Sequence, residues 1–345
     1  MKSVEIAGVK YEVKDGFLDL GLLEIKDIDE IIGLSKLRDL SNLELSSNRI
    51  IEIKGLENLN ELKILNLGSN DIKEIKGLEN LENLKILHLI SNQINEIKGL
   101  ENLTNLEELY LRGNQITELK GLDNLNSLKR LDLSWNNIKE IKNIEALTNL
   151  EVLWIAGNQL QQIKNLEILD NLEVLNLAGN KIKDIKGLEN LKKLKSLYLN
   201  NNSIQKIRGF KNLENLETLW LNTNQISKIE KLEKCRSLRI LNLKQNEISH
   251  ITGLYSLTNI ENLFLSENNI GEIKGLETLT KLETLDLGKN RIIQVKGLES
   301  LMNLKDLWLG DNLIPQKILD QLGGLDSGGC AYEPLKFVQF SLVNL

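Results

Sequence analysis

Residues 62–83 read LKILNLGSNDIKEIKGLENLEN, and this 22-residue unit recurs without a slip from Leu40 to Asn312. Counted from its first leucine, each unit follows the pattern LxxLxLxxNxIxxIxxLxxLxx. A repeat of this regularity predicts a solenoid, in which each unit buries its apolar side by stacking on its neighbours. Thirteen asparagines at position 9 mark the register: Asn48, Asn70, Asn92, Asn114, Asn136, Asn158, Asn180, Asn202, Asn224, Asn246, Asn268, Asn290 and Asn312.

Each half of the unit predicts its own local structure. Leu65 and Leu67 alternate with Asn66, which indicates a short strand with leucines on one side. The run from Ile72 to Leu81 places an apolar residue at every third position, which favours 3₁₀-like turns over a long α-helix. We therefore expect a strand, a tight returning coil, and one parallel sheet. The position 9 amides should satisfy backbone groups of adjacent coils.

On these residues the chain resembles the leucine-rich repeats, in the 22-residue subclass typified by the leucine-rich regulatory subunit of type-one protein phosphatase. The phrase EIKGLENL, at residues 74–81 and 96–103, also looks like long leucine-rich-repeat proteins of some archaea. The resemblance covers residues 40–312 of 345. It implies an α/β solenoid, a right-handed superhelix with a concave parallel β-sheet and 3₁₀-like or irregular convex segments. It further implies that the chain recruits or regulates other proteins, phosphatases among them.

Composition excludes several classes of protein. With 41% hydrophobic and 27% charged residues, the chain has enough apolar material for a long, thin core and is not disordered. Its 43 basic and 49 acidic residues are intermixed, so no basic stripe favours nucleic acid as a partner. The N-terminus lacks the apolar stretch of a signal peptide, and no run is long enough to span a bilayer. We expect a cytoplasmic protein that binds no membrane.

The positions of the two cysteines indicate free thiols, as is typical of a protein in a reducing compartment. Cys235 takes the place of a repeat leucine, whereas Cys330 lies in the C-terminal tail. About four stacked strands between them correspond to roughly 20 Å, beyond the ~7 Å Cα separation that a disulfide allows. Both are expected to be free thiols.

Residues 1–39 and 313–345 are expected to cap the thirteen repeats of residues 40–312, because an open solenoid exposes its core at both ends. At the N-terminus, alternation on either side of Ala7 and Gly8 predicts a β-hairpin, followed by a degenerate repeat with Lys26 where asparagine is expected. At the C-terminus, Pro315 and Gly323 bracket a short helix.

The final segment, residues 325–345, is expected to fold back over the last repeat, and a partner-binding tail is the alternative. Its apolar residues are Phe337, Val338, Phe340 and Leu342.

Functional information should lie where the repeats differ. The strand positions vary most, and position 5 should project from the concave face, opposite the leucines. The chain has 4 Trp, 5 Tyr and 5 Phe in 345 residues, so thirteen positions would hold about half of one aromatic by chance, yet six do. Position 5 is occupied by Glu44, Asn66, His88, Tyr110, Asp132, Trp154, Asn176, Tyr198, Trp220, Asn242, Phe264, Asp286 and Trp308.

Two interpretations compete for this excess. Aromatic residues favour strands, and cross-strand pairs stabilise sheets. Exposed aromatic rows are nevertheless costly unless a partner covers them, and Trp and Tyr commonly anchor interfaces. Our hypothesis is a partner-binding ridge of Tyr110, Trp154, Tyr198, Trp220, Phe264 and Trp308, with Trp135 at position 8 nearby. A polar rim would comprise Arg112, Arg130, Asp132, Asn176, Asn222, Asn242, Glu267, Asp286 and Asp306.

The chemistry of a catalytic or metal site is not apparent. The two histidines, His88 and His250, are more than seven repeats apart, and no Cys-x-x-Cys motif is present. Asp132 and Asp286 should lie ~34 Å apart at strand spacing, too far for paired carboxylate catalysis. Neither a nucleophile elbow nor a phosphate-binding loop is found. We expect no enzyme activity, no metal and no cofactor.

The sequence therefore predicts a monomeric, non-catalytic scaffold that binds an unidentified protein. Two alternatives stay open. Aligned aromatic rings could bind carbohydrate or another small ligand, and the chain could be a regulatory subunit of a phosphatase or GTPase.

Overall fold

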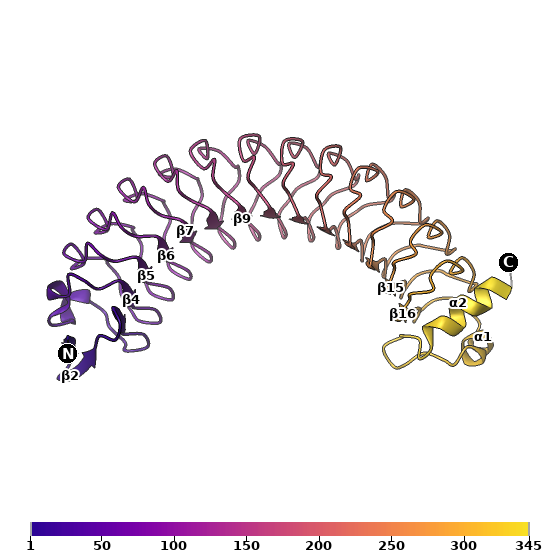
Figure 1. The fold of residues 1–345 in the computed structure, drawn as a ribbon, viewed down its shortest axis with the longest axis horizontal. Helices are drawn as coiled ribbons and strands as arrows, with labels where there is room; N and C mark the ends of the chain where they lie inside the picture. Colours follow the sequence, from indigo (N-terminus) through magenta and orange to yellow (C-terminus); the bar gives the residue numbers. More distant parts are fainter. Residues whose placement is uncertain (1, 344–345) are drawn as a thin grey trace. The chain divides into compact units, whose positions relative to one another are not determined.

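The computed structural model describes residues 2–343. The chain forms two compact units, one of residues 1–160 and 168–172 and one of residues 161–167 and 173–345. Each unit is a coil in which short strands lie on the concave side and irregular segments return on the other side (Figure 1). This is the parallel-sheet solenoid that the repeats predicted.

The first unit begins with an antiparallel hairpin of β1 (Ser3–Ile6) and β2 (Val9–Glu12). A parallel sheet follows, in which consecutive strands of this unit pair with one another. Its first strand was not predicted, since it precedes the thirteen repeats. The sheet of this unit contains β3 (Phe17–Asp19), β4 (Asn42–Glu44), β5 (Ile64–Asn66), β6 (Ile86–His88), β7 (Glu108–Tyr110), β8 (Arg130–Asp132) and β9 (Val152–Trp154).

The second unit repeats the same parallel pairing and ends in two helices, α1 (Gln316–Gln321) and α2 (Pro334–Val343). Its strands are β10 (Val174–Asn176), β11 (Ser196–Tyr198), β12 (Thr218–Trp220), β13 (Ile240–Asn242), β14 (Asn262–Phe264), β15 (Thr284–Asp286) and β16 (Asp306–Trp308).

The strands owe their register to the leucines on their buried side. Leu65 pairs with Leu87 and Leu197 with Leu219, so equivalent leucines of successive turns stack. All four are fully buried, whereas the residues flanking them in the strand are partly exposed. Burying a leucine stabilises a fold by about 1.5–3 kcal/mol, and a slip by one residue would expose the whole set.

The returning segments consist of successive tight turns. The Leu59 N–H donates to the Leu56 carbonyl at 2.9 Å, and the Leu62 N–H donates to the Leu59 carbonyl at 3.0 Å. These are the three-residue hydrogen bonds of a 3₁₀ turn, set every third residue. Among the described residues, continuous 3₁₀ helices occur only at η1 (Ile28–Glu30) and η2 (Leu34–Lys36).

The position 9 asparagines join each coil to the preceding one. The Asn114 Oδ1 accepts from the Ile94 N–H at 3.0 Å, and its Nδ2 donates to the carbonyls of Leu89 at 2.9 Å and Leu111 at 3.0 Å. Each amide therefore satisfies backbone groups that the strands and turns leave unpaired. The structural role expected for these asparagines is confirmed.

The N-terminal hairpin is tied to the turn that follows it. Glu5 and Ile32 exchange two backbone hydrogen bonds of 3.0 and 2.9 Å. Lys26 was expected at the asparagine position of the first turn, but Leu18 pairs with Leu43, so Leu23 is the residue equivalent to Asn48. The backbone of this turn is satisfied from the next one, where Asn48 Oδ1 accepts from the N–H groups of Leu23 and Ile25, both at 3.0 Å.

The C-terminal segment packs against the last turns. The N–H of Ala331 donates to the Leu307 carbonyl at 2.8 Å, beside the last strand β16. Phe337 and Val338 of α2 are fully buried. The Ser341 hydroxyl donates to Glu299 Oε1 at 2.8 Å and accepts from the Leu298 N–H at 3.1 Å. The fold-back of this tail is therefore present, although helix α2 was not predicted. Leu342 is 41% exposed.

Candidate binding face of the sheet

The exposed face of the sheet is built from positions 3, 5 and 7 of each repeat. In most strands the middle leucine is buried and both neighbours are partly exposed. The predicted aromatic residues at position 5 therefore do project from the face opposite the core. Each of the six is half-buried.

In the first unit, Tyr110 belongs to a compact cluster on β6–β8. His88 stacks on Tyr110 with ring centroids 4.6 Å apart. The Tyr110 hydroxyl donates to Glu108 Oε2 at 2.6 Å, and Arg130 Nη1 donates to Glu108 Oε1 at 2.7 Å. Burial and the Glu108 carboxylate raise the pKa of Tyr110 to about 12. Burial lowers the pKa of His88, against the opposing effect of Glu108 and Glu44. His88 was not included in the predicted site, although it occupies the same position 5.

Two tryptophans of this unit differ in exposure. Trp154 lies on β9 beside Asp132 of β8 and is half-buried. Trp135 follows β8 and is 61% exposed. Its backbone has a φ of 58°, in the left-handed region that bulky residues rarely adopt. Its ring lies over Gly157, where an added Cβ would approach Trp135 Cδ2 to 2.9 Å. The missing side chain at Gly157 thus makes room for the ring.

In the second unit, Tyr198 and Trp220 are neighbours on β11 and β12, with ring centroids 6.0 Å apart and planes tilted by 52°. Phe264 stands between Asn242 and Asp286. Trp308 is flanked by Asp286 and, through an antiparallel bridge, by Cys330. The aromatic positions within each unit are thus interrupted by polar ones.

Four residues of the predicted rim bond to their own backbone. Asp132, Asn176, Asn242 and Asp286 each accept, through Oδ1, from the N–H two residues ahead, at 2.9–3.1 Å. Asp132 is 9% exposed and Asn242 is 8% exposed. This turn-forming role is common for Asp and Asn. The Oδ1 atoms of these side chains are therefore already hydrogen-bonded, and they are less available to a partner than the sequence suggested.

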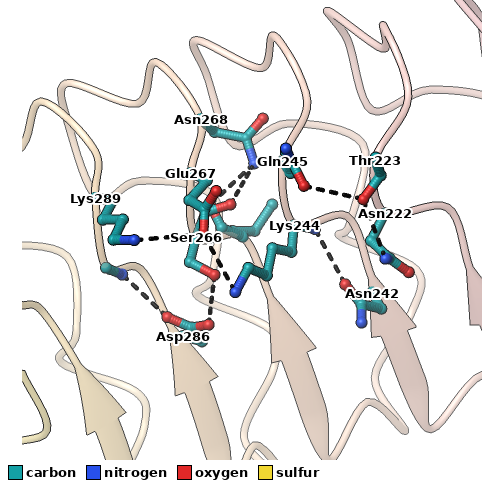
Figure 2. Close-up of polar contacts among 12 residues, drawn as sticks. Asn222, Thr223, Asn242, Lys244, Gln245, Ser266, Glu267, Asn268, Asp286 and Lys289 are labelled. Atoms are coloured by element: carbon teal, nitrogen blue, oxygen red, sulfur yellow. Dashed lines mark hydrogen bonds and ion pairs between the residues drawn. The ribbon is translucent and has the colours of Figure 1, made fainter. Parts of the chain in front are cut away.

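The other rim residues vary in their contacts. Arg112 is exposed, and Asp306 Oδ2 accepts from the Thr284 hydroxyl at 3.2 Å. Glu267 lies between two lysines, with Oε1 at 3.3 Å from Lys244 Nζ and 3.7 Å from Lys289 Nζ. Figure 2 shows this ion-paired group beside the chain of contacts from Asn222 to Gln245.

Residues 2–343 hold no group of three or more His, Cys, Asp or Glu side chains placed to bind a metal ion. Both cysteines are free. Burial raises the pKa of the Cys235 thiol to about 12, and burial also raises the pKa of Cys330. Neither is an activated thiolate. None of the helices in the described part of the chain has the length and apolar character needed to cross a membrane.

The family model described as leucine-rich repeats (2 copies) matches the chain over residues 82–124, 104–140, 126–168, 170–212, 192–234, 214–256 and 258–300. No curated protein matches the chain.

Three solved structures illustrate the likeness of the fold. An internalin from Listeria monocytogenes is 33% identical, with a TM-score of 0.77 over 84% of this chain and 85% of that one. A leucine-rich-repeat protein of Leptospira interrogans is 26% identical, with a TM-score of 0.70 over 88% and 92%. The ectodomain of a plant membrane receptor kinase from Arabidopsis thaliana is 24% identical, with a TM-score of 0.67 over 89% and 40%, and shows the fold alone.

Proposed function

Because the chain belongs to the leucine-rich-repeat family, we propose that it is a non-catalytic scaffold that binds a protein partner through the exposed face of its sheet. Proteins of this family generally mediate interactions between proteins. The proposed contact residues are the aromatics at position 5, together with Trp135 and the more accessible rim residues Arg112, Arg130, Asn222 and Glu267.

The observation that carries this proposal is the recurrence of half-buried rings on the solvent side of the sheet. A ring that is already packed against its neighbours loses little conformational freedom on binding. The cluster of His88, Glu108, Tyr110 and Arg130 is an example, since stacking and two short hydrogen bonds hold its side chains. Aromatic and arginine side chains are also the residue types that dominate binding energy at interfaces.

An alternative role is that of a regulatory subunit of a phosphatase or GTPase, and a cytoplasmic location and a monomeric state are finer parts of the proposal. They rest on the resemblance of the repeats and on composition. Recovery of an active phosphatase with the purified chain would support the regulatory role.

Affinity purification from the native cell tests the proposed surface. The triple variant Trp154→Ala, Trp220→Ala, Trp308→Ala removes three rings from the sheet face. A matched control, Tyr255→Ala with Tyr332→Ala, removes two aromatics that are 65% and 67% exposed and lie outside the strands. We expect the triple variant to lose partners that the control retains. Equal recovery by both variants, with both folded, would show that the proposed face is not the interface.

A further inference from the structure

One part of the sheet face in the second unit carries no charge. On β10–β12, positions 3, 5 and 7 hold only amide, hydroxyl, aromatic and small apolar side chains. We call the surface around Asn176, Tyr198, Asn200, Trp220, Asn222 and Asn242 the charge-free patch. The nearest position 7 cation, Lys244, is paired with Glu267 at 3.3 Å. By contrast, β7 and β8 present Glu108, Arg130 and Asp132.

The charge-free patch contains an acceptor without a donor. Asn222 Oδ1 is buried and has no hydrogen-bond partner among the described residues. The amide nitrogen of the same side chain is directed at Thr223 Oγ1, 3.4 Å away, and Thr223 Oγ1 donates to Gln245 Oε1 at 3.0 Å (Figure 2). A buried acceptor that lacks a partner is unfavourable, so a ligand donor that reached this oxygen would be favoured.

The patch also presents backbone donors. In repeats with Asp or Asn at position 5, that side chain accepts from the N–H at position 7, as Asn242 does from Lys244 at 3.1 Å. The rings of Tyr198 and Trp220 cannot do this, because an aromatic ring has no comparable acceptor at that reach. Within residues 2–343, the N–H groups of Asn200 and Asn222 accordingly have no acceptor.

These features together describe the chemistry of a ligand. It should donate and accept hydrogen bonds, carry no charge, and have an apolar surface for the two tilted rings, whose centroids are 6.0 Å apart. A pyranose sugar meets all three requirements, because its hydroxyls both donate and accept and its C–H face packs on aromatic rings. We propose that the charge-free patch binds an uncharged oligosaccharide. A peptide that adds as a strand needs an open sheet edge, which this face of the sheet does not offer.

This inference goes beyond the proposed protein partner, and it is tested without one. Calorimetric titration of the purified full chain with maltohexaose, cellohexaose, chitohexaose and mannohexaose should give saturable binding to at least one of them. For that sugar, Trp220→Ala and Asn222→Ala should each lower the association constant about tenfold, as expected for a lost ring contact or hydrogen bond. Tyr255→Ala, which removes an exposed ring outside the strands, should leave it unchanged.

Three outcomes would overturn the proposal. They are the absence of binding to all four sugars at ~10 mM, equal losses in the Trp220 and Tyr255 variants, and binding of heparin in preference to the neutral sugars. Circular dichroism of each variant ensures that a loss is not caused by unfolding. The titration contains no protein partner, so a lack of sugar binding would not bear on the proposed scaffold function. Affinity purification tests that function separately.

Discussion

The imidazole ring of His88 lies flat against the phenol ring of Tyr110, with centroids 4.6 Å apart and planes within 3° of parallel. The contact withdraws His88 from water, and this burial lowers its pKa below the ordinary 6.5. The folded chain therefore binds a proton at this site less readily than the unfolded chain does. The free energy of unfolding therefore has its full value above pH 6.5. It decreases as the pH falls through that value toward the lower pKa that His88 has in the folded chain.

The variant His88→Phe should keep the stacked ring and remove this titration. We expect thermal unfolding midpoints of the wild type to fall more between pH 7 and pH 5 than those of the variant. Proton NMR of the His88 ring provides the second measurement. A titration midpoint above 6.5 would contradict the prediction.

Asn114 should be among the most sensitive positions of the first unit. Asn114→Ala removes four hydrogen bonds and leaves the buried N–H of Ile94 unsatisfied. The carbonyls of Leu89 and Leu111 each keep one bond, from the asparagine of the neighbouring repeat. The expected loss of unfolding free energy is on the order of 3 kcal/mol, measured by urea denaturation. Asn102→Ala is the matched control, because its exposed side chain donates one bond, to Glu79, at 2.9 Å. Its loss should stay below about 1 kcal/mol, and similar losses for both variants would refute the argument.

Gly297 has no room for a side chain. Its φ is 90°, and a Cβ would lie 1.9 Å from the Ile273 carbonyl oxygen. Gly297→Ala should therefore lower the unfolding free energy by about 3 kcal/mol through backbone strain. Gly271→Ala, where nothing lies within 4 Å of the added Cβ, should be neutral or stabilise by about 0.5 kcal/mol. Denaturant unfolding of the two variants measures both free energies. A Gly297→Ala protein as stable as the wild type would contradict the tight packing of these turns.

Glu107 is held between Lys85 and Lys129, at 2.9 and 2.8 Å. Hydrogen bonds from Lys129 and then Lys85 lower the pKa of Glu107 from 4.5 to about 2. The resulting stabilisation is present above pH 4.5 and disappears as the pH falls toward 2. Because the side chains are solvent-accessible, Glu107→Gln should cost no more than about 1 kcal/mol at neutral pH and low salt.

The cost of Glu107→Gln should shrink in 1 M salt, where the Debye length is about 3 Å. Urea melts at several pH values and two salt concentrations measure it. A cost that is independent of both conditions would mean that the ion pairs contribute nothing.

The repeated part of the fold was predictable because one rule governs every turn. As expected, Leu65 and Leu67 are buried and the segment that follows forms three-residue turns. The amide of Asn70 donates to a backbone carbonyl, also as expected. Strand β3 escaped prediction since Leu18 pairs with Leu43, 25 residues later, which breaks the 22-residue period. The Leu18-x-Leu20 alternation was the signal that could have found it.

The candidate site was less predictable from sequence. Alternation placed the position 5 side chains on the correct face, but it gave no information about which of them bond to their own backbone. Asp132 and Asn242 are thereby occupied and buried. The unpaired Asn222 Oδ1 depends on the directions of neighbouring side chains, which a repeat pattern does not encode.

The C-terminal segment has a consequence for self-association. The Ala331 N–H donates to Leu307 of β16, and the Gly329 carbonyl accepts from Leu309 and Gly310, which directly follow that strand. Gly329 can approach because Gly310 has no side chain: a Cβ there would lie 2.6 Å from Gly329 Cα. An uncovered strand edge can pair with a strand of another chain. The segment that contains Gly329 and Ala331 covers the edge of β16, and we therefore expect it to prevent end-to-end association of the sheet. Deleting residues 326–343 should therefore shift the chain to higher oligomers in size-exclusion chromatography, and an unchanged elution volume would argue otherwise. Parallel pairing of this kind could continue from one chain to the next, and the C-terminal segment is the element expected to prevent such polymerisation.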